Sequence, residues 1–365
     1  MRFISKGIAA MAIAASLASP AFAQIVAGNN QPNFTSLIDN GNMNLAQRGT
    51  TAVTAITTSA KYLWDRWAAV SGTSTSVTLT NITSGVPSLF TNAAQVARVS
   101  GQSGVVKVCF MQEIPTSDIT PLAGQPVTLS FWATAGSGLT SAGNVLTAQV
   151  TTGTGADEGL ATWLTGLAGA ASAIPAANAA TTLTTAWQRF AVTGTLAATT
   201  TEAVVNFCYT PVGTAGSSDY FQITGVQLQQ GTTASNFEVR PIVMELEKAQ
   251  RYYWQWLEPA NSYAAVPGMC SAQSTTVAVC SIPLPVQMRA APTVACAFGT
   301  LKRQVAGTAT ALTACAAAAT TNGVSAVGSV NITATVASGN TAGFSGVLTG
   351  GNSTGGGLIT ASADF

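Results

Sequence analysis

Hydrophobic and polar residues alternate along most of this chain, in short runs that Gly, Ser and Asn separate. The clearest runs cover 77–80, 127–132, 190–196, 221–228, 275–282, 329–336 and 343–348. A period of two residues is typical of strands that bury one face, and many short strands with turns between them indicate a sandwich or barrel. We therefore predict a mainly β protein.

One segment departs from this alternation and has the spacing of a helix. Between Asn236 and Tyr253 the chain places Pro241 at a suitable first helical position. Apolar residues then recur on one face, at Ile242, Leu246, Ala249, Tyr253 and Trp256. We predict an amphipathic helical hinge over 238–258, which links a domain at 37–237 to a C-terminal β domain at 259–365. The Ala- and Gly-rich stretch 153–186 is predicted to be a long loop with one helical turn.

Charge is scarce. Only 7% of the 365 residues are charged and the formal net charge is +1, whereas charged residues make up about 25% of an average soluble protein. A polar but nearly uncharged surface fits an extracellular or particle-bound protein better than a cytosolic enzyme. A nearly neutral chain also argues against nucleic-acid binding, which relies on a basic surface.

The N-terminus has the pattern of a secretory signal. Arg2 and Lys6 precede an apolar run at 7–18, and Ala21-Phe22-Ala23 fits the small-residue cleavage rule. We predict a signal peptide at 1–23 and a short leader at 24–36, with no membrane span after cleavage. The expected location is secreted, periplasmic or on the cell surface.

All six cysteines follow this signal, and an even number in an exported chain favours disulfides over metal binding. Spacing alone does not fix the pairing, and buried free thiols are the alternative. Two of the cysteines, Cys109 and Cys208, lie in apolar strand-like runs. The pairs we predict are Cys109–Cys208, Cys270–Cys280 and Cys296–Cys315.

The chain has no histidine, which removes the commonest general base and metal ligand. A glycosidase needs only two carboxylates, but the visible pairs, 157–158 and 245/247, have spacings that point their side chains apart. We expect no enzymatic activity, no catalytic residues, no cofactor and no metal ion.

Aromatic rings among hydroxyl and amide groups remain as candidate chemistry, because flat rings can stack on the C–H faces of sugars. The sugar-stacking candidates are Tyr62, Trp64, Trp132 and Trp163. For each of them core packing is the alternative, since tryptophan is usually well buried. Trp67 and Trp187 are expected to belong to the core.

Several segments resemble known families. The stretches 37–49 and 62–67 resemble the opening of phage virion or tail-fibre proteins, and 237–242 with 249–253 resembles their helical hinge. Three further segments, at 125–133, 187–195 and 220–228, are similar to strands of galactose-binding-like carbohydrate-binding modules. The segment 285–294 resembles the start of the C-terminal β domain of such phage proteins.

The resemblance implies an N-terminal jelly-roll β-sandwich and a smaller, sandwich-like C-terminal β domain. It also implies a non-catalytic role in binding a glycan or a cell-surface polysaccharide. The alternative is a structural fibre or surface-assembly protein, with a homo-oligomeric state and a virion or prophage origin. Such modules often hold a structural calcium ion, but here Asp39 and Asp219 are the only acids near the first and last strands, so a calcium site is doubtful.

Overall fold

The computed structural model describes residues 35–174, 179–261, 263–305, 308–318, 325–351 and 356–364. The predicted signal peptide, 1–23, and the leader up to residue 34 lie outside the described residues. So does part of the predicted loop 153–186. Within the described part of the chain, strands predominate and helices are short, which confirms the mainly β prediction.

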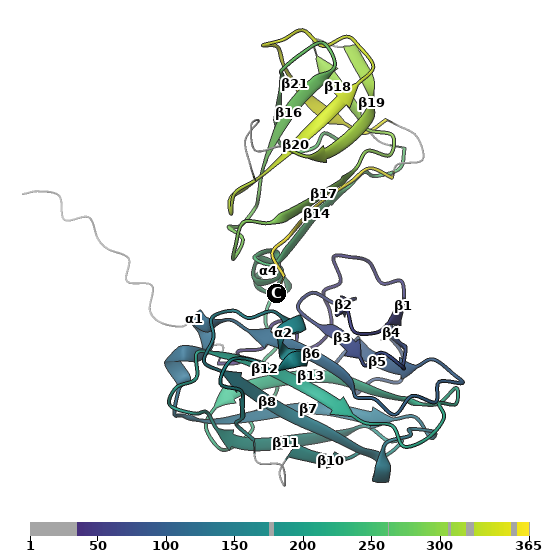
Figure 1. Ribbon diagram of the computed structural model, residues 1–365, viewed down its shortest axis with the longest axis vertical. Coiled ribbons are helices and arrows are strands. Elements are labelled where there is room, and N and C mark those ends of the chain that lie inside the picture. Colours follow the sequence, from purple (N-terminus) through teal and green to yellow (C-terminus); the bar gives the residue numbers. More distant parts are fainter. Residues whose placement is uncertain are drawn as a thin grey trace, which may run out of the picture. The chain divides into compact units, whose positions relative to one another are not determined.

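The N-terminal part of the described chain is a sandwich of two antiparallel sheets (Figure 1). The first sheet has six strands, in the order β1 (Val53–Ile56), β4 (Val77–Ile82), β5 (Ala93–Arg98), β13 (Tyr220–Gln230), β7 (Pro126–Ala135) and β11 (Gln188–Thr195). The second has seven, in the order β10 (Ala180–Thr182), β8 (Val145–Gly153), β12 (Glu202–Tyr209), β6 (Val108–Ile114), β3 (Ala68–Ser71) and β2 (Lys61–Tyr62), with β9 (Ala171–Ser172) beside β8.

The alternating runs explain how these sheets pack. In β8 the even-numbered side chains from Leu146 to Val150 are buried, and Thr147, Gln149 and Thr151 between them are half-buried. Each strand therefore sends one set of side chains into the core and leaves the other set on the outer face. The predicted strands at 77–80, 127–132, 190–196 and 221–228 fall within β4, β7, β11 and β13, apart from the last residue of the third run, Leu196.

A glycine interrupts β13, as its sequence suggested. Gly225 has a φ of 60°, and the pairing of β13 with β7 shifts register between Thr224 and Gln227. A Cβ atom at Gly225 would lie 2.3 Å from the ring of Phe90. Both the backbone conformation and the close ring favour glycine at this bulge.

The predicted helical hinge is only partly confirmed. Helix α4 covers Ile242–Gln250, and strand β14 (Tyr253–Leu257) begins three residues later. The expectation that Tyr253 and Trp256 continue the helical face is wrong, because both lie on this strand. Ile242 is also exposed, and the helix buries Glu245 and Ala249 instead.

A buried polar network fixes α4. The Asp39 carboxylate lies 2.9 Å from Lys248 Nζ and 3.4 Å from Arg66 Nε, and the Asn40 backbone donates to Glu245 at 2.7 Å. Burial raises the pKa of Asp39, but the charges of Lys248 and Arg66 outweigh it and hold the pKa below its usual value. An ion pair and a charged hydrogen bond therefore hold the helix against Asp39 and Asn40.

The other helical elements whose bounds lie within the described residues are short and belong to the sandwich region. They are α1 (Thr116–Ile119), η1 (Thr120–Leu122), η2 (Ala142–Asn144) and α2 (Leu160–Thr165). Helix α2 is the turn predicted within 153–186. No helix among the described residues has the length and apolar character needed to cross a membrane.

The C-terminal β region contains a small sheet and a barrel. The sheet has the order β14, β22 (Leu358–Ser362) and β17 (Thr293–Ala297). The barrel closes in the order β15 (Met269–Ala272), β16 (Val277–Pro283), β20 (Ser329–Val336), β19 (Thr308–Ala317), β18 (Lys302–Val305) and β21 (Ser345–Thr349). A β domain was expected here, but its sandwich-like form is replaced by a closed barrel because β21 pairs with both β15 and β18.

The three predicted disulfides are confirmed. Cys109–Cys208 joins β6 to β12 with a sequence separation of 99 residues. Cys270–Cys280 joins β15 to β16, and Cys296–Cys315 joins β17 to β19. The described residues contain no free cysteine.

Candidate functional site

The Trp64 ring is a core residue, so its role as a sugar-stacking candidate is wrong. The side chain is fully buried and packs edge-on against Phe110, with ring centroids 6.0 Å apart. Trp67, expected in the core, is also buried and stacks on Phe110 at 4.9 Å. Both tryptophans flank a turn in which Arg66 has a φ of 73°, and this turn directs both rings inward.

Trp187 shows the opposite error. It was expected in the core, but its ring is only half-buried at the surface, where Nε1 donates a hydrogen bond to the Gly85 carbonyl at 2.7 Å. Trp187 directly precedes β11, an edge strand of the six-stranded sheet. The strand alternation does not extend to this residue, and the ring lies on the sheet rim.

Two other candidates, Tyr62 and Trp163, come together on the outer face of the seven-stranded sheet. Both pack against an apolar cluster that β3, β6, β12 and the α2 region build, namely Ala68, Val70, Cys109, Met111, Leu160, Leu167, Val204 and Cys208. Tyr62 comes from β2 and Trp163 from α2. The helical turn therefore covers part of this sheet face, as Figure 1 shows where α2 overlies β6 and β12.

A groove with a volume of about 480 Å³ opens beside Trp163. We call it the Trp163 groove. Most of its lining residues carry a hydroxyl or an amide group, and Lys107 is its one charged lining residue in the described part of the chain. The lining residues are Gly72, Lys107, Thr147, Gln149, Thr151, Trp163, Asn206, Cys208, Tyr209 and Thr210.

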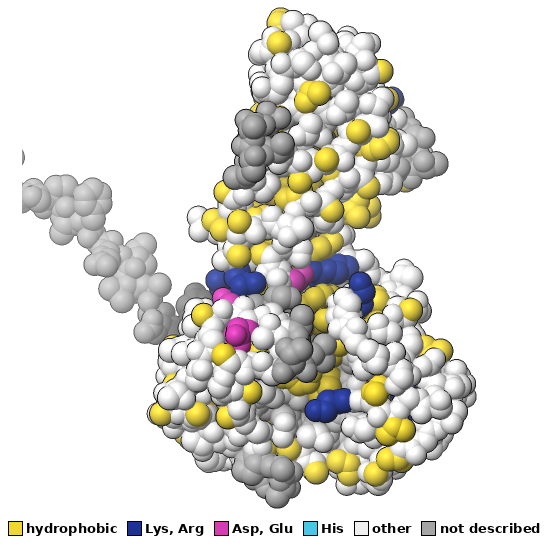
Figure 2. Space-filling view, in the orientation of Figure 1, with side chains coloured by type: hydrophobic (Ala, Val, Ile, Leu, Met, Phe, Trp, Pro, Cys, Tyr) yellow, Lys and Arg dark blue, Asp and Glu magenta, His cyan; other side chains and the backbone are white. Residues whose placement is uncertain are grey.

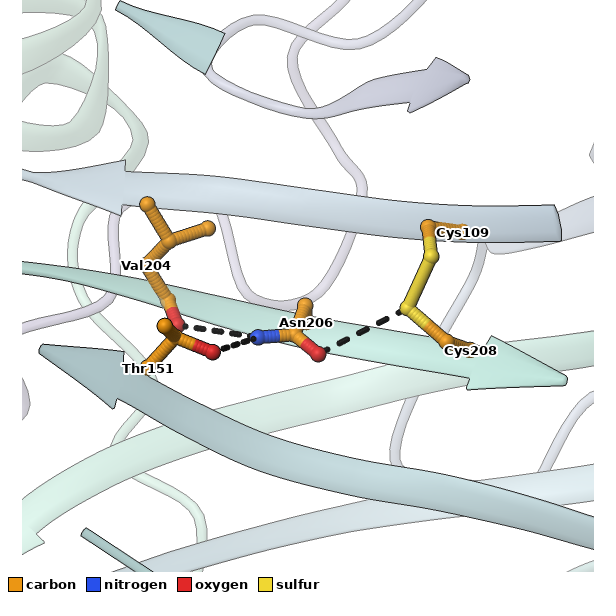
Figure 3. The surroundings of a disulfide bond; sticks show 5 residues. All are labelled: Cys109, Thr151, Val204, Asn206 and Cys208. Carbon is orange, nitrogen blue, oxygen red and sulfur yellow. Dashed lines mark hydrogen bonds between the residues drawn. A yellow bond between two sulfur atoms is a disulfide. The ribbon is translucent and has the colours of Figure 1, made fainter. Parts of the chain in front are cut away.

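Strand register sets the floor of the groove. Gln149 on β8 faces Asn206 on β12, and Thr147 faces Cys208 one step along. Alternation places all four side chains on the outer face. The Cys109–Cys208 disulfide crosses between β6 and β12 on this same face, beside Asn206 (Figure 3).

Hydrogen bonds orient the Asn206 amide. Its Nδ2 donates to Thr151 Oγ1 at 2.9 Å and to the Val204 carbonyl at 3.3 Å, while Oδ1 lies 3.5 Å from the Cys208 sulfur (Figure 3). A disulfide sulfur carries no proton, so this last contact leaves the acceptor capacity of Oδ1 unused. The Gln149 amide has no hydrogen-bond partner among the described residues. Both amides can therefore bind hydroxyl groups of a ligand.

Sequence reasoning did not identify the two groove amides. The available signal was Asn206 itself, a polar residue within the apolar run 204–209. Gln149 had a weaker signal, since it alternates with buried residues and shares the half-buried strand face with Thr147 and Thr151. Only the strand register shows that Gln149 and Asn206 are neighbours.

The carboxylates of this region are buried away from the groove. Glu113 and Glu202 are 2% and 1% exposed and neither lines the groove. Burial raises the pKa of the Glu113 carboxyl to about 9, and it raises the pKa of Glu202 as well. The two oxygens of Glu113 accept no hydrogen bond from any described group. Asp157 belongs to one of the carboxylate pairs considered for catalysis, and its Oδ2 lies 3.3 Å from Arg289 Nη1.

Trp132 lies on the other sheet. It is half-buried on β7, where it faces Thr224 of β13 and Arg189 of β11. The neighbouring Phe131 is fully buried, as the strand alternation requires. The four stacking candidates therefore divide into Tyr62 and Trp163 on one outer face, Trp132 on the opposite face, and Trp64 in the core.

The two acids considered for calcium have cationic partners. Asp39 contacts Lys248 and Arg66, and Asp219 lies 2.9 Å from Arg98 Nη1 with both side chains fully buried. Within the residues that the structure describes, no group of three or more Cys, Asp or Glu side chains is placed to hold a metal ion. Charged side chains are also few on the molecular face drawn in Figure 2.

No family model matches this chain, and no curated protein matches it. Similar solved structures include the enzymatically active domain of bacteriophage CBA120 tailspike protein 4, at 15% identity and a TM-score of 0.34. That match covers 54% of this chain and 22% of the tailspike chain. The chain thus spans about a fifth of that protein.

Carbohydrate-binding modules are also among the structural neighbours. A CBM4 structure matches at 16% identity and a TM-score of 0.31, over 53% of this chain and 99% of that chain. The CBM22-1–CBM22-2 tandem domain of Paenibacillus barcinonensis Xyn10C matches at 10% identity and a TM-score of 0.31, over 90% and 98%. At these scores the likenesses do not assign the chain to a family.

Proposed function

We propose that this chain is an exported, non-catalytic glycan-binding or adhesion protein, and that a neutral glycan binds in the Trp163 groove. The observation that carries the proposal is the combination of the Trp163 ring with amides and hydroxyls that have unused hydrogen-bonding capacity. A ring can stack on a sugar face, and Gln149 and Asn206 can bond the hydroxyls at its edge. Three disulfides support an oxidising, extracytoplasmic location.

The position of the acids supports the non-catalytic part of the proposal. Glycoside hydrolysis needs two carboxyl groups that flank a bound sugar. Glu113 has the raised pKa of a general acid, but it is buried and lies outside the groove lining, as does Glu202. We expect the purified protein to release no reducing sugar from any polysaccharide that it binds, and sustained release would overturn this part of the proposal.

The binding test uses affinity electrophoresis through gels that contain xylan, barley β-glucan, mannan or galactan. We expect at least one polysaccharide to retard the wild-type protein. Trp163→Ala should weaken that binding by about tenfold, equivalent to roughly 1.4 kcal/mol. Tyr263→Ala is the matched control, because this ring is 66% exposed and lies outside the groove.

Two further variants separate binding from folding. Gln149→Ala and Asn206→Ala leave the ring in place and remove one amide each, so each should weaken retention while far-UV circular dichroism stays unchanged. The proposal is overturned if none of the four polysaccharides retards the wild type. It is equally overturned if Trp163→Ala, Gln149→Ala and Asn206→Ala all migrate like the wild type.

The alternative, a surface-assembly protein, is favoured by one observation. Apolar side chains at the start of α4 are exposed, with Val239 at 60%, Ile242 at 52% and Val243 at 62%. Self-association would remove this apolar surface from water. Light scattering of the mature protein tests the idea, and a strict monomer at every concentration rules it out. If assembly occurs, Val243→Asp should reduce it.

A further inference from the structure

The outer face of the six-stranded sheet carries a second groove, with a volume of about 420 Å³. We call it the Trp187 groove. Its main lining residues are Gly85, Thr134, Ser137, Trp187, Tyr220 and Gln222. It lies across the sandwich from the Trp163 groove, because the two grooves use the outward-facing side chains of different sheets.

Two aromatic rings in this groove are held in place. The bond from Trp187 Nε1 to the Gly85 carbonyl fixes the indole at the rim, and both Trp187 and Tyr220 are only half-buried. The lack of a side chain at Gly136 leaves space for the Tyr220 ring. A Cβ atom there would lie 2.8 and 2.9 Å from two ring carbons of Tyr220, and 2.1 Å from the Ser218 carbonyl.

The Gln222 amide lines this groove, and the Gln95 amide pairs with it. Gln222 on β13 faces Gln95 on β5 and Thr134 on β7. Gln222 Nε2 donates to Gln95 Oε1 at 2.8 Å, which orients both amides and leaves Gln222 Oε1 as an acceptor and Gln95 Nε2 as a donor. None of the described residues that line this groove is charged.

Trp132 extends the same surface. It is two residues before Thr134 on β7, so its side chain shares the outer face with Thr134. The face thus presents three half-buried rings, Trp132, Trp187 and Tyr220, around a pair of oriented amides. Rings with neutral donors and acceptors between them match the alternating C–H faces and hydroxyl edges of a saccharide.

We infer that the Trp187 groove is a second binding site for neutral glycans, which makes the chain bivalent. The second site does not depend on the Trp163 groove, since each groove has its own ring and its own amide, but bivalency rests on the function proposed for the Trp163 groove. Two sites on opposite sheets let one chain contact two polysaccharide strands. Bivalency of this kind raises the overall avidity for a surface without any new contact.

The test uses the same four polysaccharides and the variants Trp163→Ala, Trp187→Ala and their combination. We expect Trp187→Ala to weaken retention by about threefold, because losing one of two sites removes the avidity gain. The double variant should lose retention altogether. Tyr263→Ala again serves as the matched control, and far-UV circular dichroism checks that each variant folds.

Two further variants change the second groove without removing the indole. Gln222→Ala removes one of the paired amides, and Gly136→Ala displaces the Tyr220 ring. Both should weaken retention in the Trp163→Ala background, where only the Trp187 groove remains. A turbidity assay with soluble barley β-glucan or xylan adds a direct readout, since a monomer with two sites can crosslink the polymer and a monomer with one site cannot.

The outcomes separate the two sites. Residual retention of Trp163→Ala that Trp187→Ala abolishes supports the second site. Retention lost completely with Trp163→Ala, and unchanged with Trp187→Ala, overturns the second site and leaves the first in place. Retention unaffected by Trp163→Ala but lost with Trp187→Ala has the reverse meaning. A wild type that none of the four polysaccharides retards overturns both.

Discussion

The sandwich and the C-terminal barrel region are stabilised in different ways. The sandwich core holds large, fully buried rings, among them Trp64, Trp67, Phe110 and Phe131. The C-terminal core consists mainly of Val, Ile and Leu side chains with several alanines, and two of the three disulfides lie there. A small β unit buries little apolar area, and crosslinks compensate for it.

The sandwich and the barrel also differ in the residues that line their surface grooves. Each groove of the sandwich contains at least one tryptophan, whereas the recess on the barrel has no aromatic ring among its described lining residues. The barrel recess is lined by Met269, Cys270, Ser271, Gln273, Val279, Ser281, Asn331 and Ser345. If the proposed function is correct, glycan contacts therefore belong to the two sandwich grooves.

The largest expected effect tests the aromatic core. Trp67→Ala removes a fully buried ring that stacks on Phe110, so it should lower the free energy of unfolding by about 4 kcal/mol. Denaturant unfolding followed by circular dichroism measures this loss. Trp187→Ala is the matched control, because its ring is half-exposed, and it should lose far less. Equal losses for the two variants would contradict the burial argument.

The next effect tests crosslinking in the barrel. Cys270→Ala combined with Cys280→Ala opens a loop with a sequence separation of 10 residues, which should destabilise the region by about 3 kcal/mol in the chain-entropy description. Calorimetry should show this loss in the transition of the barrel. Ser271→Ala, an exposed change on the same strand, is the control. A barrel that melts unchanged without this disulfide would show that its core is sufficient.

The sandwich and the C-terminal region each contain a buried glutamate whose pKa is shifted, and the two shifts have opposite signs. Glu113 in the sandwich accepts no hydrogen bond from the described residues, and burial raises its pKa to about 9. Burial also raises the pKa of Glu258, after β14, but the hydrogen bonds from Thr300, Gly351 and Gly357 outweigh it, so this pKa is lowered. The two carboxyl groups should therefore respond to pH in opposite directions.

Glu113 stabilises the fold when it is protonated. Its contribution is complete below its unfolded pKa of 4.5 and is lost as the pH rises toward the folded value, by at most about 1.4 kcal/mol for each pH unit. Glu113→Gln should remove this loss and stabilise the protein at about pH 8. Unfolding curves at about pH 5 and pH 8 measure it, and a variant with the same pH dependence as the wild type would contradict the assignment.

Glu258 should behave in the reverse way. Its stabilising effect is present above its unfolded pKa of 4.5 and is lost as the pH falls through the lower folded value. Glu258→Gln should therefore destabilise the barrel region most at neutral pH and least at about pH 3. This variant is the natural counterpart of Glu113→Gln.

Strands and disulfides could be predicted from the sequence because both depend on patterns within short stretches of the chain. Alternation marks a strand without knowledge of its neighbours, and run 329–336 coincides with β20. Cys109 and Cys208 could be paired because both lie in apolar runs. Barrel closure has no such local pattern, since it depends on β21 pairing with two strands that are distant in sequence.

The errors arise where one pattern fits two structures. Tyr253 and Trp256 have the spacing to continue the helical face from Ala249. The same residues can also form a strand, in which Tyr253, Gln255 and Leu257 share one face. Pairing with β22 favours the strand. Trp64 and Trp187 lie outside regular strands, so alternation could not sort them into core and surface. Trp163 was one of several aromatic candidates, and its contact with a ligand stays a prediction.

The smallest expected effect concerns Lys107, the one charged lining residue of the Trp163 groove in the described chain. Its side chain is exposed, so water and salt screen its charge, and an uncharged sugar has no partner for it. Lys107→Gln should therefore change the affinity for a neutral glycan by about twofold or less, and Asn331→Ala in the barrel recess should leave it unchanged. Titration calorimetry at low and high salt measures both. A large, salt-dependent loss with Lys107→Gln alone would mean that the groove selects an acidic glycan, and a loss with Asn331→Ala would mean that the barrel takes part in binding.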